Sequence, residues 1–262
     1  MRSLILTFAL FGFAAPSAAQ LTTTYTGTQT ANGRTVPATA TFAVETGHVA
    51  AIMKGTRSAR LVFDEKAQVL HMIDDETKTY LDLDKSTMGG AGDPMQMMQA
   101  QLAKMTPEQR AQAEPMMKSM MGAMAAPPPL TYTQRPGTLT VAGYDCTLFE
   151  GTRGGQKVTE YCGSTSNDFR MSDAERATML AMQTYLRNVA ILVRTSDDAT
   201  RAFQWDTSVD GYPVLTRCFV NGATTLDLTL DHVTRTPIPR DVFEIPKGYK
   251  KQELPKMGGR GR

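Results

Sequence analysis

Two cysteines placed symmetrically about a glycine turn constrain the fold of this chain more than any other feature. Cys146 and Cys162 lie equally far from Gly154, and the stretch between them is interpreted as a β-hairpin with a cysteine on each strand. A loop at 153–155 would place the cysteines directly opposite each other, where Cβ atoms lie roughly 4.5–5.5 Å apart. A disulfide needs a similar separation, so we predict a Cys146–Cys162 bridge, worth about 3 kcal/mol in the chain-entropy account.

The chain holds a third cysteine, Cys218, so counting alone does not fix the pairing. Three pairings are open, and each leaves one thiol over. Cys218 lies in 212–220, which has the composition of a strand, and we expect a buried thiol there. A thiol that bonds another chain or has a regulatory role is the alternative.

The N-terminal residues have the pattern of a secretory signal peptide. Arg2 supplies a positive charge, an apolar run follows at 4–13, and small residues suited to cleavage follow at 14–20. The apolar run is too short to span a bilayer, and no later stretch is apolar over a membrane-spanning length. We therefore expect a signal peptide at 1–20, cleavage near Ala19-Gln20, and a periplasmic or secreted mature protein without a transmembrane segment. Such an oxidising compartment favours disulfides.

The charge of the chain is nearly balanced. A formal net charge of +2 gives no reason to expect a nucleic-acid partner. The length allows one large domain or two small ones, and we place a single β-rich domain at 21–250. Lysines and arginines mixed with glycine and proline at 251–262 predict a disordered basic tail.

The β-rich part of the chain is interpreted as a series of antiparallel strands. In residues 21–84, alternating apolar and polar residues are separated by turn-forming clusters at regular spacing. Three more strands are expected at 201–205, 212–220 and 224–233. The last two are joined by Asn221-Gly222, a strong hairpin signal.

One helix is predicted within this β-rich part. Ser172 and Glu175 have the spacing of a capping box, which opens a helix. Its apolar face consists of Met179, Met182, Leu186, Val189 and Val193. The predicted fold class is α+β and mainly antiparallel β, with a curved sheet or unclosed β-barrel and helices covering its open side.

Residues 88–126 differ from the rest, since ten of the seventeen methionines lie there. Helix-start signals at Asp93-Pro94 and Thr106-Pro107 predict a Met-rich helical insert at 88–126. Apolar side chains recur on it with helical periodicity. The candidate residues for a hydrophobic binding surface are Met95, Met98, Leu102, Met105, Met117, Met120, Met121 and Met124.

Three interpretations of this insert are open. In the first, the helices pack their methionines onto the sheet as ordinary core. In the second, they form an apolar lid or groove for a hydrophobic ligand or partner, because methionine adapts to varied apolar shapes. In the third, sulfur atoms bind Cu(I), which prefers soft ligands, although no Cys or His lies within the cluster. The candidate Cu(I) ligands are Met117, Met120, Met121 and Met124.

Motifs of the common enzyme classes are absent from the sequence. It has no Gly-x-Ser-x-Gly, no His-Glu-x-x-His and no phosphate-binding glycine loop. His48, His71 and His232 have no recognisable metal or nucleophile partner in the sequence. The cysteines lack the Cys-x-x-Cys spacing of redox sites. We therefore expect a non-enzymatic protein with no catalytic residues, no resident metal and no cofactor.

The end of the chain carries a motif that resembles a known family. A C-terminal signature of a secreted bacterial family of unknown function (domain of unknown function 4412) has the same residues and spacing as Ile238-Pro239, Phe243, Pro246 and Gly248-Tyr249. Further matches to that family are the hairpin sequences Val141–Cys146 and Glu160–Cys162 and the Pro-Glu-Gln-Arg motif at 107–110. The resemblance implies the same cysteine pair, and the family has no established catalytic or ligand residues.

The order of elements is also similar to that of the periplasmic lipoprotein-carrier superfamily. Those proteins are curved, unclosed β-barrels with helices over the mouth and an apolar cavity for acyl chains, and the resemblance implies this fold here. We expect an exported, periplasmic binding protein for a lipid, another hydrophobic ligand or the apolar segment of a partner. The alternatives are a Met-rich Cu(I)-binding protein and a structural or interaction module of the cell envelope, with an envelope protein as its partner.

Overall fold

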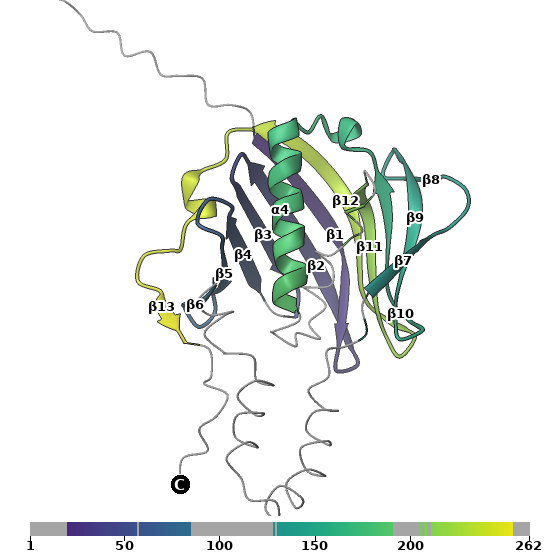
Figure 1. Cartoon of the computed structure of the whole chain (residues 1–262). Coiled ribbons are helices and arrows are strands. Elements are labelled where there is room, and N and C mark those ends of the chain that lie inside the picture. Colours follow the sequence, from purple (N-terminus) through teal and green to yellow (C-terminus); the bar gives the residue numbers. More distant parts are fainter. Residues whose placement is uncertain are drawn as a thin grey trace, which may run out of the picture.

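The computed structural model describes residues 20–56, 58–84, 128, 130–190, 205, 207–208 and 211–253 (Figure 1). The predicted Met-rich insert lies outside these residues, as does the predicted signal peptide except for Gln20. The described residues form thirteen strands, one α-helix and two 3₁₀ helices.

The first six strands are β1 (Gln20–Ala31), β2 (Arg34–Glu45), β3 (His48–Lys54), β4 (Ala59–Asp64), β5 (Val69–Asp74) and β6 (Thr79–Leu83). The others are β7 (Leu130–Gln134), β8 (Leu139–Val141), β9 (Tyr144–Arg153), β10 (Gln156–Ser164), β11 (Tyr212–Val220), β12 (Ala223–Thr236) and β13 (Lys250–Gln252). The helices are η1 (Ser166–Phe169), α4 (Asp173–Ala190) and η2 (Arg240–Phe243).

All strands belong to one sheet, in the order β13-β6-β5-β4-β3-β2-β1-β12-β11-β10-β9-β7, with β8 paired to β9. Neighbours are antiparallel, except that β13 is parallel to β6. The path ends at β13 and β7, which do not pair with each other, so the curved sheet is unclosed (Figure 1). The predicted mainly antiparallel, unclosed sheet is confirmed.

Period-two alternation explains how the strands build a core. On β1, Leu21, Thr23 and Tyr25 are buried, while Thr22 and Thr24 between them are partly exposed. The buried side chains lie on the face that α4 covers, which we call the inner face. The helix crosses this face over β2 and β3 (Figure 1).

The helix fills the centre of the inner face. Four of its apolar or aromatic side chains are at most 6% exposed, namely Met179, Met182, Tyr185 and Leu186. The Tyr185 hydroxyl donates to the carbonyl oxygen of Leu83 at 2.6 Å, and its ring lies 5.4 Å from that of Phe63. The core in the middle of the curved sheet is therefore made of the protein's own side chains.

The predicted capping box is present at the start of α4. The backbone N–H of Glu175 donates to Ser172 Oγ at 3.3 Å, and that of Ser172 donates to the Glu175 carboxylate at 2.8 Å. Of the predicted apolar face, Met179, Met182 and Leu186 are buried. The side chains of 189 and 193 lie outside the described part.

The β9–β10 hairpin differs from the prediction in its turn. Gln156 pairs with Arg153, so the turn consists of 154–155 alone and not of three residues. A register shift follows after Lys157, where the chain contains a β-bulge or irregularity. A one-residue change in the turn and the later shift together displace the two cysteines relative to each other.

The disulfide nevertheless joins the predicted pair. Cys162 lies opposite Leu148, so the prediction that the cysteines are directly opposite is wrong. Cys146 lies one residue beyond the last β9–β10 pair, Thr147 with Gly163, and it pairs with Leu139 of β8. The Cα atoms of the two cysteines are 5.4 Å apart and the sulfur atoms are bonded.

The C-terminal segment 238–249 covers part of the outer face of the sheet. It packs on a second buried cluster, which consists of Ala43, Ala50, Val62 and Ile73. β13 continues the segment along β6, where Lys251 Nζ lies 2.7 Å from Asp82. Lys251 and Gln252, at the start of the predicted tail, thus lie in a strand, while 254–262 lie outside the described residues.

Candidate functional site

The residues predicted to bind a hydrophobic ligand lie outside the described part of the chain. They are Met95, Met98, Leu102, Met105, Met117, Met120, Met121 and Met124. The four candidate Cu(I) ligands are among them. The structure tests neither prediction.

A pocket opens beside the first half of α4, with a volume of about 230 Å³. Its apolar walls come from Met171, Met179, Leu180, Trp205 and Tyr212. Its polar lining residues are Ser166, Arg176, Thr207 and Ser208, with Gly211 completing the wall. An apolar cavity with a few polar groups is the usual composition of a small-molecule site.

A second, smaller cavity lies between Trp205 and the sheet. Its volume of about 10 Å³ leaves room for about one water molecule. It is lined by Tyr25, Ala40, Phe42, Trp205, Tyr212, Pro213, Thr216 and Leu228. Because Trp205 and Tyr212 line both cavities, they form the partition between the open pocket and the sheet.

Aromatic rings continue from this partition toward the hairpin. The Trp205 and Tyr212 centroids are 5.6 Å apart, and Tyr212 lies 4.8 Å from Phe169 of η1. Phe169 in turn stacks on Tyr144 of β9 at 5.1 Å. Aromatic contacts of this kind add about 0.5–1.5 kcal/mol each beyond burial, so this wall of the pocket is held in place.

The buried tyrosine hydroxyls behind the partition are neutral donors. Tyr25 donates to the carbonyl oxygen of Pro213 at 2.8 Å, and the hydroxyls of Tyr212 and Thr23 lie 3.3 Å apart. Burial raises the pKa of Tyr212 to about 12 and raises the pKa of Tyr25 well above its ordinary value. Neither phenol ionises near neutral pH, so neither serves there as a general base.

An ion pair fixes the helix start at the edge of the pocket. Arg235 of β12 donates to the Glu175 carboxylate at 2.6 Å and to the carbonyl oxygen of Phe169 at 3.2 Å. Burial alone raises the pKa of Glu175, but hydrogen bonds from Arg235 and Ser172 outweigh it, so this pKa lies below its ordinary value. The sheet, η1 and α4 therefore meet at one charged contact.

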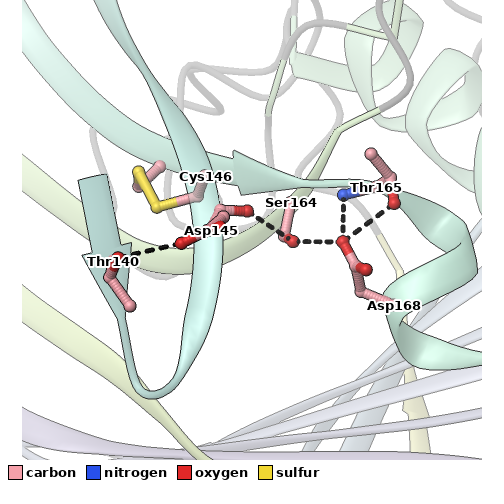
Figure 2. Close-up of a disulfide and its surroundings, with 7 residues drawn as sticks. Thr140, Asp145, Cys146, Ser164, Thr165 and Asp168 are labelled. Carbon is pink, nitrogen blue, oxygen red and sulfur yellow. Dashed lines mark hydrogen bonds between the residues drawn. A yellow bond between two sulfur atoms is a disulfide. The ribbon is translucent and has the colours of Figure 1, made fainter. Parts of the chain in front are cut away.

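The disulfide lies close to η1, which supplies part of the pocket wall (Figure 2). Ser164 Oγ lies 2.9 Å from the carbonyl oxygen of Asp145 and 2.6 Å from Asp168 Oδ2. These contacts link the strand that carries Cys146 to η1, which contains Ser166 of the pocket and Phe169. The hydrogen bond from Ser164, together with others, lowers the pKa of Asp168.

Asp82 of β6 is paired with basic side chains of the neighbouring strands β5 and β13. His71 Nδ1 and Lys251 Nζ lie 2.6 Å and 2.7 Å from the two carboxylate oxygens of Asp82. This cluster joins β5, β6 and β13.

In the described ranges no group of three or more His, Cys, Asp or Glu side chains is arranged to hold a metal ion. Cys218 is fully buried in the core and forms no disulfide.

In comparisons with known proteins, no family model and no curated sequence matches the chain. Membership of the family with domain of unknown function 4412 therefore stays a prediction, and so does the lipoprotein-carrier resemblance. Among the described residues, no helix has the length and apolar character needed to cross a membrane.

The pocket residues were missed by reasoning from sequence. Trp205 was expected in a strand at 201–205, and Tyr212 at the start of another. The one usable signal was that Trp205 is the single tryptophan of the chain. Its position at the partition depends on contacts with Tyr212, seven positions along the chain, and with the sheet beneath it.

Proposed function

We propose that the protein is an exported, non-enzymatic binding protein that holds a lipid or another hydrophobic ligand in the pocket beside α4. One observation supports this most directly. The pocket has walls of Met171, Met179, Trp205 and Tyr212 and opens to solvent next to a filled core. A soluble protein gains no stability from leaving apolar walls open, so an apolar ligand is a reasonable occupant.

The size of the pocket sets the kind of ligand. Its volume of about 230 Å³ is below the roughly 300–1,000 Å³ of sites that enclose a drug-sized molecule. It therefore suits one hydrocarbon chain or a part of a larger molecule. Each buried methionine or leucine side chain contributes about 1.5–3 kcal/mol. A few such contacts are enough for micromolar binding, about 8 kcal/mol, after the costs of ordering.

The single tryptophan allows a direct test. Trp205 lines the pocket, so a fatty acid with bromine on its chain should quench its fluorescence saturably, and the unbrominated acid should compete. Lipid extraction of protein purified from its host should also recover bound lipid. Absence of both quenching and co-purified lipid would remove the proposal.

Two exposed leucines provide a matched pair of variants. Leu180 lines the pocket and is 40% exposed, whereas Leu139 lies on β8 and is 46% exposed. Because both are partly in solvent, lysine is tolerated at either position. Leu180→Lys should weaken the quenching by the brominated acid at least tenfold, and Leu139→Lys should leave it unchanged. Equal effects would indicate that the quencher binds elsewhere.

A structural or interaction module of the envelope is the second candidate. The observation in its favour is the filled inner face, where Met182, Tyr185 and Leu186 occupy the centre of the curved sheet. Crosslinking in the host followed by purification should then recover one defined protein partner, and the purified protein should carry no lipid. Recovery of lipid without a partner would reject this candidate.

A further inference from the structure

The pocket beside α4 combines apolar walls with a single positive charge. Arg176 is the one charged side chain among the described residues that line it. Thr207 and Ser208, which carry hydroxyl groups, line the same pocket. Met171, Met179 and Trp205 supply apolar lining in the same pocket. A ligand that fits both parts has a hydrocarbon portion and an anionic or hydrogen-bonding head.

Arg176 is able to accept a new partner. Its Nη2 donates to Asp173 Oδ1 at 2.8 Å, and the two side chains are 46% and 96% exposed. Such a surface ion pair contributes about 1 kcal/mol or less to stability. A guanidinium has five N–H donors and pairs with a carboxylate through two of them. A ligand carboxylate can therefore join or replace Asp173 at little cost to the fold.

The ligand's head gains more from Arg176 than Asp173 does. Asp173 is almost fully solvated, so its attraction to the guanidinium is screened by water. A ligand head at the mouth of an apolar pocket is partly shielded by its own chain and by Leu180 and Met179. The same charge pair is stronger in that less polar surrounding.

We propose that the pocket binds a single-chain amphiphile with a monoanionic head, such as a fatty acid, whose carboxylate pairs with Arg176 while its chain lies against Met171, Met179 and Trp205. The inference rests on the proposed function and adds the chemical class of the ligand. The volume of about 230 Å³ accommodates one chain, which argues against lipids with two.

The test compares head groups on one chain length. Trp205 fluorescence is titrated with a fatty acid and with the alkyl sulfonate, the primary alcohol and the alkyltrimethylammonium of equal length. The acid and the sulfonate should bind about tenfold more tightly than the alcohol, equivalent to about 1.4 kcal/mol, and the ammonium should bind least. Arg176→Gln should abolish the preference, and Arg176→Lys should retain part of it.

Arg135 provides the matched control. It is 53% exposed and its Nη2 lies 2.7 Å from Glu150, so its environment is close to that of Arg176, but it does not line the pocket. Arg135→Gln should leave all four affinities unchanged. A loss of head-group preference in Arg135→Gln as large as in Arg176→Gln would overturn the assignment to Arg176.

The outcomes separate this inference from the proposed function. Equal binding of acid and alcohol, or an unchanged preference in Arg176→Gln, would reject the anionic head and leave hydrophobic binding standing. Tighter binding to two-chain phosphatidylglycerol vesicles than to the free acid would reject the single-chain ligand. Failure of every amphiphile to change or quench Trp205 fluorescence would remove both.

Discussion

Among the single residues, Gly27 shows how closely β1 and β12 approach each other. A Cβ atom at this position would overlap the backbone carbonyl oxygen of Asp227. The strand backbone cannot move away without breaking the pairing with β12. We therefore expect Gly27→Ala to lower the free energy of unfolding by about 3 kcal/mol or more, measured by urea denaturation.

The neighbouring residue on β1 provides the control for this substitution. Thr28 is exposed, and Thr28→Ala removes only strand propensity and surface contacts. Its cost should be below about 1 kcal/mol. Similar losses in Gly27→Ala and Thr28→Ala would show that β1 and β12 are less tightly apposed than the structure indicates.

The Glu175 carboxylate gives the protein a pH-dependent contribution to stability. Burial and hydrogen bonds from Arg235 and Ser172 act in opposite directions on its pKa, and the net effect places it below the ordinary value of 4.5. Because the folded-state pKa is lowered, this contribution is present above about pH 4.5 and is lost as pH falls through the folded pKa. Acidification should therefore weaken the contact between α4 and β12.

Urea denaturation between about pH 7 and pH 3 measures this contribution. Glu175→Gln should be less stable than the wild type by roughly 1–3 kcal/mol near pH 7, with a flatter profile below pH 5. Glu244→Gln, at an exposed position, should keep the wild-type profile. Parallel profiles of Glu175→Gln and the wild type would contradict the assigned role.

The sequence predicted the disulfide partners but not their register. The partners follow from two cysteines on the arms of one hairpin, which is local information. The register shift depends on packing between strands, where Thr159 Cγ2 occupies the space that a Cβ on Gly151 would fill. Complementarity of this kind is not visible in the turn residues, so the cysteines were wrongly placed opposite each other.

Among the elements, the β9–β10 hairpin depends most on a covalent link. Its disulfide spans a sequence separation of 16, for which the chain-entropy account gives about 3 kcal/mol. We expect the double variant Cys146→Ser, Cys162→Ser to be less stable by about this amount and to remain folded. Urea denaturation measures the loss, and the position of Trp205 emission reports whether η1 still supports the pocket.

Thiol counting provides the control for this hairpin. The denatured protein should expose one reactive thiol before reduction, from Cys218, and three after it. Cys218→Ala should then show none before reduction. Three reactive thiols in the untreated wild type would mean that the bridge does not form in solution.

The C-terminal segment acts as a cover for the outer face. Residues 238–249 shield Ala43, Ala50, Val62 and Ile73, which are otherwise an apolar patch on a surface. Deletion of 238–262 should lower the melting temperature by more than about 5 °C, roughly 2 kcal/mol, and should promote binding of a hydrophobic dye. Deletion of 254–262 alone should change neither, and equal effects would reject the cover.

At the scale of elements, short sequence motifs correctly predicted where a helix starts and where a hairpin turns, whereas the pairing of strands far apart in the chain was not predicted. Ser172 and Glu175 correctly marked the start of α4, and Asn221-Gly222 correctly marked the β11–β12 turn, where both residues have positive φ. The pairing of Gln20 with Thr236 joins the first strand to the twelfth and leaves no trace in either segment alone. The pocket could not be predicted from the sequence for the same reason, because its walls come from elements that are separate in the chain.

The whole molecule is organised by one continuous sheet. Strands β2–β6 lie on one side of β1 and β7–β11 on the other side of β12, so the β1–β12 pairing joins two groups of strands. Tyr25 of β1 contributes to the same inner core as Leu228 and Leu230 of β12, and α4 covers that core from above. Neither group has a separate inner core, and we therefore expect the molecule to unfold in a single cooperative transition.

Two fluorescent positions test this cooperativity, one in each group of strands. Trp205 reports on the β11 side, and Tyr80→Trp in a Trp205→Phe background reports on the β6 side, where Tyr80 packs on the outer-face cluster. Under urea, each variant should give one midpoint for its fluorescence that coincides with its own far-ultraviolet circular dichroism. Separate midpoints in either variant would show that the β1–β12 pairing connects two units that fold independently. The pocket would then need both units, because α4 packs over β2 and β3 whereas Tyr212 belongs to β11.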